Sequence, residues 1–174
     1  AAGICGSDMH AYHGLDERRI PPLILGHEIS GINQTDNNPV VINPLITCGK
    51  CQECLDEREH ICSNRSLLGM TKPVARAGGF AEFVAAPSQN VFSVPLSANL
   101  QDLALTEPTA VALHAIKIAE QVSFKKIHKA KILIIGGGAI GLLLALVLKI
   151  KNAENVMIVD TNTKRLDVCK KASS

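Results

Sequence analysis

Four cysteines fall within fifteen residues in the segment CGKCQECLDEREHIC, residues 48–62. Their spacing is C-x2-C-x2-C-x7-C, and closely spaced thiolates bind metal ions. A bacterial ferredoxin run shares the first two gaps, but its last gap is three residues long and a proline follows it. Here the last gap is seven residues and Ser63 follows. The four candidate ligands are Cys48, Cys51, Cys54 and Cys62.

This spacing favours zinc over the alternatives. Four thiolates around one Zn²⁺ form a closed tetrahedral site, which holds a loop in shape and leaves no open position for chemistry. Two local disulfides would close strained rings between close neighbours. We therefore expect a structural zinc in a lobe at residues 46–66, with an iron–sulfur cluster and disulfides as the alternatives. The catalytic residues should lie elsewhere.

A glycine-rich turn, GGGAIG at residues 136–141, is the second chemical signal. It fits G-x-G-x-x-G, follows the aliphatic run KILII (131–135), and precedes a nearly apolar helical pattern. The glycines permit a tight turn, close approach of a pyrophosphate and close packing of helix on strand. The helix N-terminus favours phosphate binding. This context favours a dinucleotide site over a plain strand–helix–strand turn.

The next strand-like run ends in Asp160, nineteen residues past Gly141. Its carboxylate would accept hydrogen bonds from an adenosine ribose and repel a 2′-phosphate, which favours NAD over NADP. The basic neighbours Lys164 and Arg165 soften this preference. The expected cofactor-binding residues are Gly136, Gly138, Ala139, Ile140, Gly141, Asp160 and Arg165.

Three further motifs carry a possible second metal site: GICGSDMH (3–10), GHEISG (26–31) and TEPTAVALHA (106–115). Alone, Cys5 would be a small buried residue and His27 a hydrogen-bonded core histidine. Together they are borderline-soft ligands for a catalytic zinc with an open position.

In their order along the chain, these motifs resemble those of the zinc-dependent medium-chain dehydrogenases of the alcohol dehydrogenase superfamily. The resemblance is closest to the polyol branch that includes sorbitol (iditol) and threonine dehydrogenases. It runs through nearly the whole chain and includes the cysteine lobe, GGFAEFV (78–84) and the glycine turn. It implies an α/β plus β fold: an incomplete GroES-like β-rich catalytic domain, then the first βαβ of a Rossmann doubly wound domain.

The resemblance also implies the ligands of the catalytic zinc. Cys5 and His27 match the two constant ligands, and Glu28 matches the acid that ligates the metal or sits just behind it. Glu107 matches the position where alcohol dehydrogenases have a third cysteine and polyol dehydrogenases have glutamate. There it would bind zinc directly or through water.

Further residues are implied to move protons and orient ligands. Ser7 matches the hydroxyl that hydrogen-bonds the substrate oxygen, and His10 matches a later member of the proton relay to solvent. Asp8 matches the carboxylate that orients the ligand histidine. With Glu28, these are the residues to which the resemblance assigns catalytic roles.

The implied activity is reversible hydride transfer from a polyol or secondary alcohol to NAD, with two zinc ions per chain, one catalytic and one structural. Glu107 favours polyols over simple alcohols. The alternatives are a threonine or sugar-phosphate alcohol dehydrogenase, and a truncated remnant that binds zinc without activity. The resemblance also implies a homo-oligomer, a dimer or tetramer, in the full-length form.

The pattern of residues divides the chain in two. Irregular β structure is expected over 1–107, and α/β structure over 108–174. Expected strands lie within 23–31, 40–46, 78–87, 91–94, 131–135 and 155–160. Expected helices cover 98–105 with Asn99 as N-cap, 108–121 opened by Pro108, 139–150, and a stretch from about Thr163 onward.

Composition limits the partners. The 174 residues carry a net charge of +2 and are 47% hydrophobic and 20% charged, which predicts a packed core. No basic stripe points to nucleic acid or an anionic membrane. The longest apolar run, 139–148, is too short to span a bilayer. The cysteines are interpreted as reduced, which predicts a cytoplasmic protein with a small-molecule alcohol as its partner.

Several features depart from the family pattern. The chain starts at Ala1 and stops within a helical pattern, and INQTDNNP (32–39) is shorter than the usual strand–turn–strand. We therefore expect a fragment that is unstable alone and has little activity. DERR (16–19) is expected to be a solvated loop, and Cys169 a small buried residue.

Overall fold

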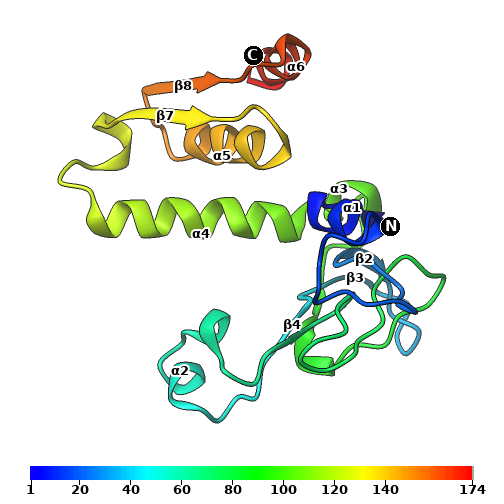
Figure 1. Ribbon diagram of the computed structural model, residues 1–174. Coiled ribbons are helices and arrows are strands. Elements are labelled where there is room, and N and C mark those ends of the chain that lie inside the picture. The colour runs from blue at the N-terminus through cyan, green and yellow to red at the C-terminus, as the bar shows by residue number, and fades with distance from the viewer. Residues whose placement is uncertain (174) are drawn as a thin grey trace. The chain divides into compact units, whose positions relative to one another are not determined.

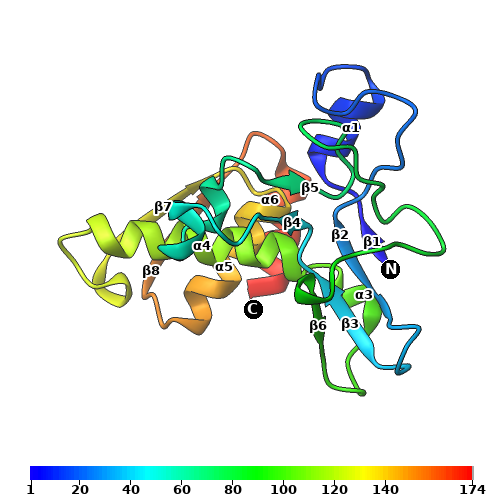
Figure 2. The same ribbon diagram turned by 90° about the horizontal axis from the view of Figure 1, so that it is seen from below.

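The computed structural model describes residues 1–173, and the chain divides into two units. The first unit, Ala1–Glu107, is built on antiparallel strand pairing. Its main sheet has the strand order β1-β2-β3-β6 (Figure 2). Ile29 of β2 pairs with Ile42 of β3, and together with Ile46 and Leu68 they form the buried core of the unit. The strands are β1 (Ala2–Gly3), β2 (Glu28–Ile32), β3 (Pro39–Ile42) and β6 (Val91–Ser93).

The cysteine lobe is the part of the first unit between β4 (Leu45–Ile46) and β5 (Ser66–Leu67), which pair antiparallel. It contains one short helix, α2 (Gln52–Leu55), and a 3₁₀ turn at Glu59–Ile61. Leu55 is 67% exposed and Ile61 44% exposed, so the lobe has little apolar core of its own. A segment of this kind needs another source of order.

The second unit begins at Pro108 and contains a parallel strand pair (Figure 1). Strands β7 (Lys131–Ile135) and β8 (Asn155–Val159) lie side by side, and α5 (Ala139–Ile150) connects them and packs against both. Helices α4 (Thr106–Val122) and α6 (Thr163–Ser173) flank this βαβ motif in sequence. The core of the unit is a buried aliphatic cluster of Ile116, Ile134, Ala145, Val147 and Leu148.

Most expected elements are confirmed, and the clearest errors lie in the first unit. Helix α3 (Leu100–Leu103) begins after Asn99, whose side chain accepts a hydrogen bond from Gln101 N at 2.7 Å. Helix α4 starts at Thr106, two residues before Pro108, so Pro108 does not open it.

The strand expected over 78–87 is wrong, because no strand forms there. Instead, the N–H groups of Gly78, Gly79 and Phe80 donate to the carbonyls of Ile24, Gly26 and Leu25 in an irregular loop–loop contact.

The loop 16–19 is also not fully solvated, since Arg19 is only 4% exposed. Arg18, its neighbour, keeps an exposed side chain. Among the helices of the described residues, none combines the length and apolarity that a membrane crossing requires.

Candidate functional site

The four cysteines of the lobe converge on one point. Their sulfur atoms are separated by 3.4 Å (Cys51–Cys54), 3.6 Å (Cys48–Cys62), 3.7 Å (Cys51–Cys62) and 4.0 Å (Cys48–Cys54). Zinc–sulfur bonds of about 2.3 Å in a regular tetrahedron place sulfurs about 3.8 Å apart. The observed separations therefore fit one tetrahedral zinc ion.

Among the thiols of the lobe, Cys48 is the one most readily ionised, whereas the neighbouring thiols raise the pKa of Cys51 to about 12. Hydrogen bonds from the backbone N–H groups of Lys50 and Cys51 lower the pKa of Cys48 to about 6. Metal binding requires thiolates, so a lowered pKa favours it. None of the six cysteines forms a disulfide, which excludes the disulfide alternative in this structure.

A second group of ligands forms beside β2. Ligand atoms of Cys5, His27 and Glu28 all lie within 4.8 Å of one another. Cys5 immediately precedes α1 (Gly6–Tyr12), and β1 pairs with β2 so that Gly3 is opposite Glu28. This short antiparallel contact brings GICG and GHE together, although 22 positions separate Cys5 from His27.

Asp8 links the two ends of this group. One oxygen, Oδ2, accepts a hydrogen bond from Cys5 N at 3.0 Å, and the other, Oδ1, lies 3.4 Å from His27 Nδ1. Asp8 is 2% exposed, and neither Oδ1 nor Nδ1 has a partner with full hydrogen-bond geometry. A carboxylate beside Nδ1 leaves Nε2 as the nitrogen available to a metal, which is the usual carboxylate–histidine–metal arrangement.

The pKa values of two carboxyl groups, Glu28 and Glu107, are shifted by this environment. Burial raises the pKa of Glu28, and the negative charge of Asp8 raises it further, against the lowering effect of His27. Burial likewise raises the pKa of Glu107, with His27 lowering it and Glu28 and Asp8 raising it. Buried acids of this kind are stabilised as anions by a cation. Glu107 nevertheless lies outside the set of ligand atoms within 4.8 Å.

Gly3 makes room for the Glu28 carboxylate, a role that sequence reasoning missed. A Cβ on Gly3 would lie 2.0 Å from Glu28 Oε2 and 3.1 Å from Glu28 Cβ. We expect Gly3→Ala to push the carboxylate away and to weaken zinc binding at this site about tenfold. Competition with a chromophoric chelator measures that affinity.

The matched control is Gly31→Ala on the same sheet, where an added Cβ meets nothing within 4 Å. It should leave the zinc affinity unchanged. Equal affinities of Gly3→Ala and the parent protein would show that Glu28 does not hold the metal.

The proposed proton-handling residues are less tightly grouped. Ser7 is half-buried in α1, and its Oγ accepts a hydrogen bond from Arg19 Nη2 at 3.3 Å. His10 is exposed on the same helix. Arg19 is a second residue that sequence reasoning missed, because its polar neighbours resemble a solvated loop.

The glycine turn has the expected form in the second unit. Gly136 has φ +105°, and a Cβ on Gly141 would lie 1.9 Å from the carbonyl oxygen of Gly136, so both positions require glycine. Helix α5 begins at Ala139 with Gly138 as its N-cap. Its first N–H groups are therefore free for an anion.

Asp160 closes this turn from the end of β8. Its Oδ2 accepts from Gly137 N and its Oδ1 from Asn162 N, both at 2.7 Å. The Asn162 bond, then the Gly137 bond, hold the pKa of Asp160 below its ordinary value. Arg165 Nη1 lies 3.6 Å away on α6, with a side chain 59% exposed.

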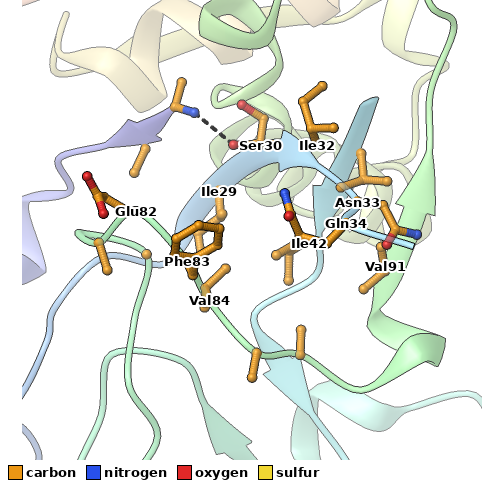
Figure 3. Close-up of a pocket in the computed structure, with 18 residues that line it drawn as sticks. Ile29, Ser30, Ile32, Asn33, Gln34, Ile42, Glu82, Phe83, Val84 and Val91 are labelled. Carbon is orange, nitrogen blue, oxygen red and sulfur yellow. Dashed lines mark hydrogen bonds between the residues drawn. The ribbon is translucent and has the colours of Figure 1, made fainter. Parts of the chain in front are cut away.

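A pocket of about 430 Å³ in the first unit lies apart from these groups (Figure 3). It is lined mainly by apolar side chains, among them Ile29, Ile42, Phe83 and Val84, and its one titratable side chain is Glu82. None of the candidate metal ligands lines it. The pocket therefore does not coincide with the proposed chemistry.

Comparisons with known proteins give the family of the chain. Residues 1–96 match the family model of the alcohol dehydrogenase GroES-like domain. The chain is 36% identical to a 2-dehydro-3-deoxy-L-galactonate 5-dehydrogenase of Pseudoalteromonas atlantica, over 94% of this chain and 48% of the relative. It is 35% identical to an L-threonine 3-dehydrogenase of Streptomyces coelicolor, over 99% and 51%.

Solved structures give the same result. A galactitol-1-phosphate dehydrogenase from Escherichia coli matches with a TM-score of 0.84 and 30% identity, covering 99% of this chain and 50% of that one. A zinc-binding dehydrogenase from Sinorhizobium meliloti, bound to NADP, matches with a TM-score of 0.85 and 31% identity, covering 100% and 51%. The chain spans about half the length of the curated relatives it matches.

Proposed function

Since this chain belongs to the family of the alcohol dehydrogenase GroES-like domain, we propose that the protein oxidises a polyol or another secondary alcohol reversibly with NAD⁺. The comparisons also confirm the fold class, a GroES-like domain followed by the start of a Rossmann-type domain. The observation that carries the proposal is the convergence of Cys5, His27 and Glu28 within 4.8 Å, beside the buried Asp8.

The donor set fits a catalytic metal site. One thiol, one imidazole and one carboxylate would hold a zinc ion, and catalytic zinc sites keep a further position open for substrate. A zinc ion held there would supply Lewis acidity, which lowers the pKa of a substrate hydroxyl and polarises a carbonyl. The four-cysteine group, in contrast, is closed and fits a structural zinc.

The remaining residues act on the proton and the ligand geometry. Asp8 fixes the orientation of the His27 ring through its contact with Nδ1. Ser7 hydrogen-bonds the reacting oxygen, and His10, which is exposed, passes the proton to water. Glu107 places a negative charge near His27 and Glu28, and it would bind the zinc directly or through water.

The second unit would bind the dinucleotide. The N-terminus of α5 favours the pyrophosphate, and Asp160 favours an unmodified ribose over one that carries a 2′-phosphate. The Sinorhizobium meliloti neighbour was solved with NADP bound, so the phosphorylated cofactor is the alternative to be tested. The preference for NAD therefore depends on Asp160 and on Arg165 beside it.

Asp160→Asn tests this preference. The change removes a charge and leaves one of two backbone N–H groups without its acceptor. We expect the ratio of NADPH to NADH affinity to rise about tenfold, measured by cofactor fluorescence. Asp167→Asn, on the exposed face of α6, makes the same charge change without these contacts and should leave the ratio unchanged. A ratio that stays constant in both variants contradicts the role of Asp160.

The named relatives guide the search for a substrate. Their names specify a galactonate derivative, L-threonine and galactitol 1-phosphate. The test of the proposal is to assay a panel of these three compounds and sorbitol as substrates of the full-length protein, with NAD⁺ and with NADP⁺. Oxidation of any of them that requires bound zinc supports it, and no turnover with any secondary alcohol contradicts it. We further expect a cytoplasmic homo-oligomer.

A further inference from the structure

The buried guanidinium of Arg19 contacts the hydroxyl of Ser7, which hydrogen-bonds the substrate oxygen in the proposed reaction. We propose that Arg19 is a positioning residue that fixes the direction of the Ser7 hydroxyl proton. This inference rests on the proposed function, because it assigns Arg19 a role in the same reaction. The Arg19 side chain is 2% exposed, which is unusual for a residue that always carries a charge.

Three contacts hold the guanidinium in place. Nε donates to the carbonyl of Gly69 at 3.2 Å, Nη1 pairs with Asp16 Oδ2, and Nη2 donates to Ser7 Oγ at 3.3 Å. The three partners belong to a turn, a loop and helix α1, so the planar fork ties three separate segments together. A lysine has one nitrogen and lacks this geometry.

The contact with Ser7 determines which way its proton points. Arginine has donors only, so Ser7 Oγ must be the acceptor in this hydrogen bond. The proton of Ser7 is therefore directed away from Arg19, and the described residues supply no hydrogen bond in which Ser7 is the donor. The hydroxyl is left to donate to a substrate oxygen, or to accept from it through its second lone pair.

The charge of Arg19 is balanced where it is buried. Asp16 contacts Arg18 through both oxygens, at 3.0 and 3.2 Å, and Arg19 through Oδ2. These bonds, chiefly those of Arg18, hold the pKa of Asp16 below its ordinary value, so Asp16 stays ionised. Paired and buried, Arg19 is a poor receptor for a substrate anion, and its contact with Ser7 is not needed for its neutralisation.

A matched pair of cations makes the proposal testable. Arg18 shares Asp16 with Arg19, but its side chain is 62% exposed and does not contact Ser7. Four variants of the full-length protein, Arg19→Gln, Arg18→Gln, Ser7→Ala and the double variant Ser7→Ala/Arg19→Gln, are compared for kcat and KM. The substrate is whichever compound of the panel above the parent protein oxidises.

We expect Arg19→Gln to lower kcat about 10- to 100-fold with little change in KM, because a displaced hydroxyl affects the reacting geometry. In the Ser7→Ala background the same change should cost less than about threefold, since the residue acts through Ser7. Arg18→Gln should stay within about twofold of the parent. Multiplicative losses in the double variant, or a rise in KM with kcat unchanged, overturn the proposal.

A second measurement separates the failure of this proposal from that of the proposed function. The same variants form a double-mutant cycle on the unfolding equilibrium, where Arg19 and Ser7 should couple about 2- to 10-fold. Independent effects on unfolding show that the hydrogen bond is absent and overturn the proposal. If Arg19 and Ser7 couple but the protein oxidises no alcohol, the hydrogen bond is present and the proposed function is wrong. The role of Arg19 in that reaction is then refuted as well.

Discussion

Replacement of Cys54 by serine is expected to remove one zinc ion from the protein and to unfold residues 46–66. Between Ile46, which is buried in the core of the unit, and β5, the lobe has only the four-residue helix α2 and one 3₁₀ turn, and its large apolar side chains there, Leu55 and Ile61, are exposed. Metal binding therefore supplies most of its order, and structural zinc contributes about 10 kcal/mol or more in small metal-folded domains. Hydrogen exchange measured by peptide mass spectrometry should show a loss of protection confined to this segment.

The matched control for this change is Cys169→Ser. Cys169 is also a buried cysteine outside any disulfide, but it lies on α6 and contacts the glycine turn through Gly137. That variant should keep its full zinc content and normal exchange over 46–66. A Cys54→Ser protein whose lobe stays protected would mean that the four thiols do not hold the segment together through a metal.

Replacement of His27 by alanine is expected to abolish turnover, with a loss of at least about 10³-fold. The change removes the imidazole from the Cys5, His27 and Glu28 group and leaves the buried Asp8 without its neighbour. Zinc would then be held weakly or not at all, while the distant cysteine lobe keeps its own ligands. Steady-state kinetics, with zinc content measured on the same samples, follow both effects.

His13→Ala is the control for the loss of a histidine near the site. His13 is exposed just after α1 and stacks edge-to-face on Tyr12, without a place among the proposed ligands. Its turnover should remain close to that of the parent protein. A His27→Ala enzyme that keeps its turnover would move the proposed reaction away from this site.

The parts of the fold that follow from local pattern could be predicted closely. The run 131–135 and the segment 139–150 match β7 and α5 to the residue, because continuous aliphatic sequence interrupted by glycines admits few other structures. The four-cysteine group could also be located, since cysteine spacing reflects metal geometry. Only a resemblance, however, related Cys5 to His27, because a two-residue strand brings them together.

Features that depend on contacts between distant segments could not be predicted. The alternating pattern of 78–87 indicates a strand, yet its backbone bonds to the loop at 24–26. Arg19 resembles a surface residue until Asp16 and Gly69 are seen to enclose it. Gly3 shows no sign of its closeness to Glu28 in the sequence. In each case the residue that makes the contact is at least three positions away in the sequence, and only folding brings the two together.

The protein is expected to hold two zinc ions in sites of different character, and zinc analysis of the His27→Ala protein tests this most directly. The parent should contain two zinc ions per chain. The variant should retain one, and X-ray absorption should show that ion surrounded by four sulfur atoms at about 2.3 Å. A variant that keeps both ions, or a remaining ion with nitrogen or oxygen ligands, would contradict the assignment of His27 to one site and of the four cysteines to the other.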